Sequence, residues 1–150
     1  MQNKYFELFS SIQPDTRTSL DSILIIYGLN TFLRAFTMIN HINPNGHHIG
    51  GLTGFLKSVG YAIKMLNPTK VVIIFDGIGG SNARRNLYPE YKANRAKTPD
   101  EFRSQMSYLH DLVTGFGITQ FEVEGFEADD IIATITKQAE KEGAEVLICT

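Results

Sequence analysis

Residues 23–27 read ILIIY, and residues 71–76 read VVIIFD. Each is a short, continuous apolar run rich in β-branched side chains, which is typical of a strand buried on both faces of a parallel sheet. Two further runs, ITQFEV at 118–123 and EVLIC at 145–149, predict two more strands. Apolar residues at three- and four-residue spacing predict helices between the runs, over about residues 30–39, 49–63, 99–113 and 127–142.

Strands that alternate with helices in this way indicate an α/β fold, with a mostly parallel sheet flanked by helices on both faces. We expect the first helix to begin near Asn30, because asparagine is a good helix cap. We expect the helix that starts after Pro99 to bury Leu112 along with its other apolar residues.

The composition excludes several classes of protein. The 150 residues suffice for one domain with a hydrophobic core, and no apolar run approaches the roughly 20 residues of a membrane-spanning helix. The N-terminus lacks the basic start and apolar block of a secretory signal. A single cysteine, Cys149, excludes an internal disulfide framework and is typical of a reducing compartment.

Acidic residues gather where the last predicted helix begins, in the stretch VEGFEADDIIATI at residues 123–135, which contains Glu124, Glu127, Asp129 and Asp130. Asp76 ends a predicted strand, and ligands of parallel sheets gather beyond the carboxyl ends of the strands. Carboxylates that face one cleft, with no base nearby in the sequence, favour a hard cation such as Mg²⁺ or Mn²⁺. Two simpler explanations stay open: acids at a helix start complement its dipole, and an Asp-Gly pair can form a turn.

A basic and aromatic stretch, RRNLYPEYKANRAK at residues 84–97, lies between Asp76 and the acidic helix start. Its five Lys and Arg residues against one Glu give a local charge of +4, whereas the rest of the chain sums to −6. Tyrosines interleaved with bases can stack on nucleobases while the bases contact phosphates. A solvated charged surface is the open alternative, and Arg34 can equally contact a phosphate or pair with a surface acid.

Four stretches carry a family resemblance: ILIIYGLNTFLRAF, VVIIFDG, YPEYKANRAKTPDEF and EGFEADDIIAT. Together they resemble the 5′-3′ exonuclease domain of bacterial DNA polymerase I and its phage flap-endonuclease relatives, from about Ile23 to Thr150. The resemblance implies a PIN-like (Rossmann-like) nuclease fold and two or more divalent cations, Mg²⁺ or Mn²⁺. It also implies hydrolysis of a phosphodiester at a free 5′ end or flap junction.

The resemblance also assigns roles to residues of this chain. Those that resemble the family's catalytic, metal-binding carboxylates are Asp76, Glu127, Asp129 and Asp130. Those that resemble its phosphate-contacting bases are Arg34, Arg84, Lys92 and Arg95. Tyr91 resembles the aromatic residue of the family's arch, and Arg85 is an additional base that we assign to nucleic-acid binding.

The chain departs from the family in two ways. Tyr27 stands where the family has an Asp that holds the first metal, and a phenol with a pKa near 10 is a poor Mg²⁺ ligand. The family continues beyond the position of Thr150 with further metal-binding acids and a duplex-gripping helix-hairpin module. We therefore expect a fragment of a longer protein, with an N-terminal extension at 1–22, the N-terminal part of an exonuclease domain at 23–150, and an arch-like basic segment at about 80–98.

The function expected from these residues is a metal-dependent, structure-specific 5′-3′ exonuclease and flap endonuclease of replication or repair, which is inactive as this fragment with Tyr27. The expected partners are DNA with 5′ ends or flaps, with RNA–DNA hybrids as a further candidate, and the expected state is a cytoplasmic monomer in a bacterial cell or phage-infected host. Two alternatives stay open. One is a nucleic-acid-binding relative with impaired catalysis, and the other is an unrelated α/β ligand-binding domain whose acids merely cap a helix.

Overall fold

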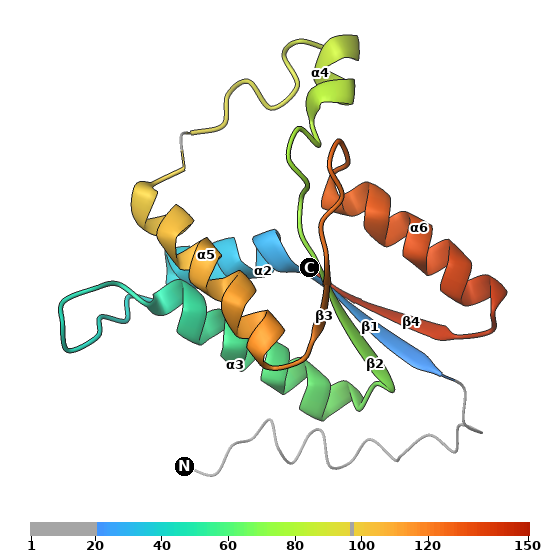
Figure 1. Ribbon diagram of the computed structural model, residues 1–150, viewed down its shortest axis with the longest axis horizontal. Helices are drawn as coiled ribbons and strands as arrows, with labels where there is room; N and C mark the ends of the chain where they lie inside the picture. The colour runs from blue at the N-terminus through green and yellow to red at the C-terminus, as the bar shows by residue number, and fades with distance from the viewer. Residues whose placement is uncertain (1–20, 97) are drawn as a thin grey trace.

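A four-stranded parallel sheet forms the centre of the molecule (Figure 1). The computed structural model describes residues 21–96 and 98–150. The strands are β1 (Ser22–Tyr27), β2 (Lys70–Ile74), β3 (Thr119–Phe121) and β4 (Glu145–Cys149), in the spatial order β3-β2-β1-β4. All neighbours pair in parallel, with Ile25 of β1 opposite Val72 of β2 and Ile148 of β4. The predicted α/β class and parallel sheet are confirmed.

Helices connect the strands and cover the sheet. They are α2 (Gly28–Met38), α3 (Gly50–Leu66), α4 (Asn82–Leu87), α5 (Asp100–Gly115) and α6 (Ala128–Lys141). In the described part of the chain, no helix is long and apolar enough to cross a membrane.

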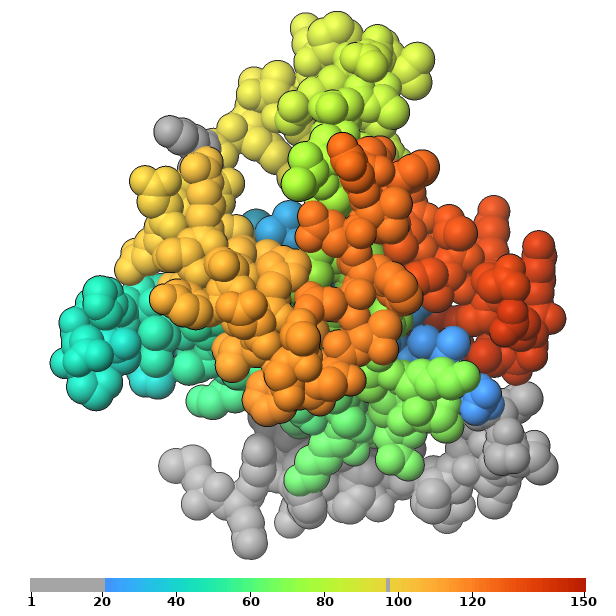
Figure 2. All heavy atoms as spheres, in the orientation of Figure 1, coloured from blue at the N-terminus to red at the C-terminus, as the bar shows by residue number. Residues whose placement is uncertain are grey.

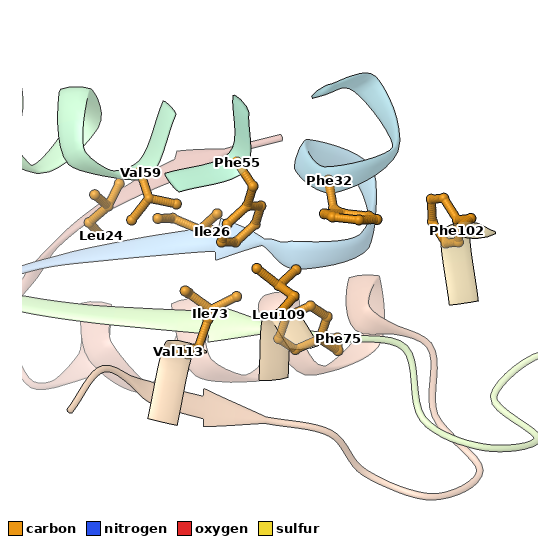
Figure 3. Close-up of a cluster of buried hydrophobic side chains, with 10 residues drawn as sticks. All are labelled: Leu24, Ile26, Phe32, Phe55, Val59, Ile73, Phe75, Phe102, Leu109 and Val113. Carbon is orange, nitrogen blue, oxygen red and sulfur yellow. The ribbon is translucent and has the colours of Figure 1, made fainter. Parts of the chain in front are cut away.

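Alternate residues of β1 and β2 enter two different cores. Leu24, Ile26 and Ile73 pack with buried residues of α2, α3 and α5 on one face of the sheet (Figure 3). Ile25 and Ile74 pack on the other face with α6. The continuous apolar runs of the sequence are thus explained, because both faces of these strands are buried.

Three details of the sequence prediction are wrong. The helix α2 starts at Gly28, directly after β1, so Tyr27 rather than Asn30 is its N-cap. This early start needs glycine, since a Cβ on residue 28 would lie 2.4 Å from the ring of Phe75. Leu112 is 36% exposed instead of buried, because the buried positions of α5 lie on the face of Leu109. The strand β3 is limited to three residues, since only these pair with β2.

Two loops beyond the ends of β2 and β3 pack directly against each other. The amide of Gly77 donates to the carbonyl of Phe126 at 3.0 Å, and the amide of Gly125 donates to the carbonyl of Ile78 at 2.8 Å. A Cβ on Gly77 would lie 1.8 Å from the carbonyl oxygen of Val123, so only glycine allows this close approach. The contact holds Asp76 beside the first turn of α6.

The basic segment projects from the body of the molecule. None of the residues of α4 is buried, and residues 89–94 after it form turns. Figure 2 shows α4 and the residues that follow it as a separate lobe at the top of the view. Its side chains therefore depend on a few specific contacts, rather than on a core, for their positions.

Candidate metal and nucleic-acid site

Tyr27 and Asp76 meet at the carboxyl ends of β1 and β2. The Tyr27 hydroxyl donates to Asp76 Oδ2 at 3.0 Å, with Oδ1 at 3.3 Å. Asp76 Oδ1 also accepts from the backbone N–H of Ala128, the first residue of α6, at 3.0 Å. Burial above all, and then the charge of Asp76, raises the pKa of Tyr27. The phenol is therefore neutral, and it serves as a hydrogen-bond donor to Asp76 rather than as an anion.

Glu127 is buried at the N-terminus of α6, with 2% of its surface exposed. Its Oε1 accepts from Lys92 Nζ and from Ser81 Oγ, each at 2.5 Å. Its Oε2 accepts from the Tyr91 hydroxyl at 3.0 Å and lies 3.2 Å from Arg84 Nη1. Burial, the largest single influence, raises the pKa of Glu127, but the hydrogen bonds from Lys92, Ser81 and Tyr91 together lower it to about 2. The carboxylate is therefore charged and fully partnered.

Arg84 joins Glu127 to Asp130. Its two terminal nitrogens donate to the two Asp130 carboxylate oxygens at 2.8 and 2.6 Å, in a planar, bidentate pair. Asp130 Oδ2 also accepts from the backbone N–H of Glu127 at 3.3 Å. The hydrogen bond from Arg84 lowers the pKa of Asp130. The first turn of α6 thus carries two carboxylates that the basic segment neutralises.

The remaining predicted residues differ in their surroundings. Asp129 is exposed next to the cluster, and its side chain has no hydrogen bond or ion pair with any described residue. The side chains of Arg85 and Arg95 are also exposed and without a hydrogen bond or ion pair in residues 21–96 and 98–150. Arg34, on α2, donates instead to the backbone carbonyl of Thr150. The structure therefore does not bring Arg34 into contact with the acids.

One inference from the sequence is corrected here. The acids are not without nearby bases, because Arg84 and Lys92 reach them across 46 and 35 residues of sequence. Ser81 was not singled out at all, although its hydroxyl contacts Glu127. A serine after a glycine-rich turn is an ordinary loop residue, so no local pattern in the sequence identifies it.

The carboxylate oxygens are suitable ligands for a hard cation, but residues of the protein itself already bind them. Carboxylate oxygens are the ligands that Mg²⁺ and Mn²⁺ prefer. Among the described residues, however, no group of three acids, histidines or cysteines is placed as a ready metal site. Arg84 and Lys92 supply the positive charge instead, and the Tyr27 hydroxyl donates a hydrogen bond to the carboxylate of Asp76. A cation can use these carboxylates only after some of these partners move.

A cavity of about 510 Å³ opens beside Tyr27. Residues of α2, including Leu33 and Phe36, line one side, and Arg95 and Pro99 from the segment after α4 lie on another. The cavity is mostly apolar with one guanidinium in its lining. Of the predicted site residues, Tyr27 and Arg95 line it, whereas none of the four acids does.

Comparison with known proteins assigns the chain to a family. A family model described as the 5′-3′ exonuclease N-terminal resolvase-like domain matches residues 22–150. The chain is 37% identical over 125 residues to DNA polymerase I of Lactococcus lactis, covering 80% of this chain. It is 39% identical over 129 residues to the thermostable DNA polymerase I of Thermus thermophilus, covering 85% of this chain. The chain spans only 14% and 15% of the length of these two relatives.

Solved structures show the same fold. A flap endonuclease of bacteriophage T5 in complex with DNA and metal ions matches with a TM-score of 0.61 at 22% identity, over 85% of this chain and 47% of that one. A zinc-bound T5 5′-exonuclease matches with a TM-score of 0.60 at 19% identity, over 85% and 48% of the two chains. At this identity the likeness concerns the fold. From the sequence matches, the chain belongs to the 5′-3′ exonuclease family and is not an unrelated α/β ligand-binding domain.

Proposed function

We propose that this chain forms the carboxylate and arch part of a metal-dependent, structure-specific 5′ nuclease that acts on DNA with 5′ ends or flaps. The observation that carries the proposal is the meeting of Asp76, Glu127 and Asp130 beyond the carboxyl ends of the strands, within a basic and aromatic segment. In a parallel α/β sheet this edge is where ligands bind.

In this proposal the cation ligands are Asp76, Glu127, Asp129 and Asp130. Asp129 is already exposed and free of partners within the described residues, so it offers the first contact for a hydrated ion. A bound Mg²⁺ or Mn²⁺ would stabilise charge on the phosphate oxygens and lower the pKa of bound water. The metal-bound T5 nucleases of the same fold support the dependence on a divalent cation.

The proposed nucleic-acid contacts are those of the basic segment at about residues 80–98 together with α2, namely Arg34, Arg84, Arg85, Tyr91, Lys92 and Arg95. The bases would hold phosphates. The half-buried Tyr91 would keep Lys92 and Glu127 in position, because its hydroxyl donates to Glu127. Contacts of this kind position the strand without reading its sequence. RNA–DNA hybrids present the same phosphates and are a further candidate substrate.

A second candidate function is a nucleic-acid-binding relative with impaired catalysis. The specific observation in its favour is the hydrogen bond from Tyr27 to Asp76, since a neutral phenol occupies a position where the family resemblance implies a metal-binding Asp. The two functions differ in one respect only: the second predicts DNA binding without cleavage even when the rest of the nuclease is present.

We propose that the protein acts as a monomer in the cytoplasm of a bacterial cell or phage-infected host.

Titration with Mn²⁺ tests the proposed site directly. Isothermal titration calorimetry of the purified chain should show saturable Mn²⁺ binding that weakens about tenfold or more in Asp129→Asn and in Asp76→Asn. Glu140→Gln is the matched control, because Glu140 is an exposed acid on the same helix but outside the cluster. Absence of Mn²⁺ binding would contradict the metal site. So would an equal loss of Mn²⁺ affinity in Asp129→Asn, Asp76→Asn and the control Glu140→Gln.

A further inference from the structure

The cluster of carboxylates is occupied by the protein's own cations. Lys92 Nζ lies 2.5 Å from Glu127 Oε1, and the guanidinium of Arg84 spans Asp130 and Glu127. The Lys92 side chain is only 17% exposed, and that of Glu127 is 3% exposed. The Lys92–Glu127 pair is therefore close and shielded, whereas Arg84 and Asp130, whose side chains are 37% and 35% exposed, form a close but partly solvated pair.

External ligands compete with these internal ion pairs. A divalent cation on Glu127 or Asp130 would lie next to the Lys92 ammonium and the Arg84 guanidinium, and these like charges repel, most strongly at the shielded Glu127. Conversely, the charges of Arg84 and Lys92 are already compensated by the carboxylates, so a DNA phosphate competes with Glu127 and Asp130 for these bases. DNA that binds the bases thus frees the carboxylates for the cation, and a cation that binds the carboxylates frees the bases for DNA.

We propose that Arg84 and Lys92 act as internal counterions of the carboxylate cluster, and that DNA and a divalent cation displace them together. DNA phosphates take the two bases, which frees Glu127 and Asp130 for the cation, so the two ligands bind with positive coupling. This inference rests on the proposed function, because it takes the cluster as the cation site. It adds that the free protein holds this site closed.

The segment that carries these bases has the freedom that such an exchange needs. No residue of α4 is buried, so its release exposes no core. Two residues with positive φ, Gly79 (71°) just before the segment and Lys92 (59°) within it, lie on either side of α4. The ion pairs and the hydrogen bonds from Ser81 and Tyr91 are the described contacts that join its side chains to α6.

Coupling can also arise without any exchange, if a DNA phosphate simply becomes an additional ligand of the cation. The two explanations differ in the absence of DNA. If Lys92 blocks the site, removing its charge should strengthen cation binding by the DNA-free protein. If coupling comes only from phosphate ligation, the same change should leave DNA-free binding as it was.

The experiment is Mn²⁺ titration calorimetry on the chain and three variants, first without and then with a 5′-flap oligonucleotide. Lys92→Gln should bind Mn²⁺ about tenfold more tightly than wild type without DNA, within the range typical of coupled ligands. Lys57→Gln, an exposed lysine of α3 with the same charge change, should behave as wild type. Tyr91→Phe, which removes a neutral donor from Glu127, should have a smaller effect than Lys92→Gln. The oligonucleotide should raise Mn²⁺ affinity in wild type and raise it less in Lys92→Gln.

The outcomes distinguish failure of the proposed metal site from failure of the proposed displacement of Arg84 and Lys92. No saturable Mn²⁺ binding by any of these proteins would overturn the metal site and this inference with it. Saturable binding that Lys92→Gln leaves unchanged or weakens would overturn the exchange alone. Circular dichroism checks that each variant is folded, and Arg84→Gln repeats the test from the second base if Lys92→Gln does not fold. A gain in affinity cannot come from unfolding, so the expected result is unambiguous.

Discussion

The hydroxyl of Tyr27 lies 3.0 Å from Asp76 Oδ2 and donates a hydrogen bond to it, across the carboxyl ends of two paired strands. The pair fixes the ring of Tyr27 at the edge of the acidic cluster. Because the pKa of Tyr27 is raised by burial and by Asp76, the phenol adds no negative charge there. The site therefore has one anionic oxygen donor fewer than the carboxylate-lined site that the family resemblance implies.

The purified chain is expected to show negligible nuclease activity in Mg²⁺. Metal-assisted hydrolysis commonly uses two cations about 4 Å apart, one beside the attacking water and one beside the leaving oxygen. Tyr27 supplies no ligand for such a pair, and Arg84 and Lys92 hold two of the acids. The measurement is cleavage of a 5′-labelled flap substrate. Robust Mg²⁺-dependent cleavage that Asp76→Ala abolishes would contradict this prediction.

The exposed bases Arg85 and Arg95 are expected to dominate the initial contact with DNA, since they have no ion pair within the described part of the chain. The double variant Arg85→Ala/Arg95→Ala should weaken binding to a 5′-flap oligonucleotide equally for all sequences and reduce the salt dependence. Fluorescence anisotropy at several salt concentrations measures both effects. Lys57→Ala/Lys137→Ala, with the same charge change on α3 and α6, is the control. Unchanged affinity of the arginine variant at low salt would exclude this role.

Acid should destabilise the folded chain through Glu127. Its folded pKa of about 2 lies below the ordinary value near 4.3 of an unfolded chain. The stabilisation is therefore complete above about pH 4.3 and is lost as the pH falls toward 2. Urea unfolding at pH 7, 4, 3 and 2 should show this loss. Glu127→Gln should lower stability at pH 7 by about 1–3 kcal/mol and flatten the pH dependence, whereas the exposed-site change Glu140→Gln should keep the wild-type slope.

The contact between the loops after β2 and before α6 predicts that Gly77 cannot be replaced by a larger residue without a loss of stability. Gly77→Ala should lower the free energy of unfolding by about 2–3 kcal/mol or more, because the new Cβ meets the carbonyl of Val123. Gly60→Ala is the matched change on α3, where a Cβ meets nothing within 4 Å. It should stabilise the protein by up to about 1 kcal/mol, since alanine favours a helix. Equal stabilities of the two variants would contradict the steric role of Gly77.

The sequence predicts the sheet well, because a strand buried on both faces leaves a continuous apolar run such as Ile23–Tyr27. It predicts element ends less well: Gly28 starts α2 early because of a tertiary contact with Phe75, and a cap preference for Asn30 cannot register that contact. The acids at the start of α6 can be identified from the sequence because they lie close together along the chain.

Their partners were not predicted. The pairs of Glu127 with Lys92 and Ser81, and of Asp130 with Arg84, form only after the loops dock. Periodicity and composition report neighbours along the chain, so a contact across 35 or more residues leaves no such trace. The assignment of these bases to phosphates rather than to acids remains a prediction.

The central claim is that residue 27 lies in a cation site made with Asp76 and the first turn of α6, and Tyr27→Asp tests it most directly. An aspartate there replaces a neutral donor with one more anionic oxygen, so Mn²⁺ affinity measured by titration calorimetry should rise about tenfold. The apo protein should gain no stability, since another carboxylate adds repulsion. Tyr27→Phe, which removes the same hydrogen bond without adding a charge, is the control and should not bind Mn²⁺ as tightly as Tyr27→Asp. A rise in Tyr27→Asp alone is the predicted result, and equal Mn²⁺ affinity in Tyr27→Asp and the unaltered chain would contradict the claim.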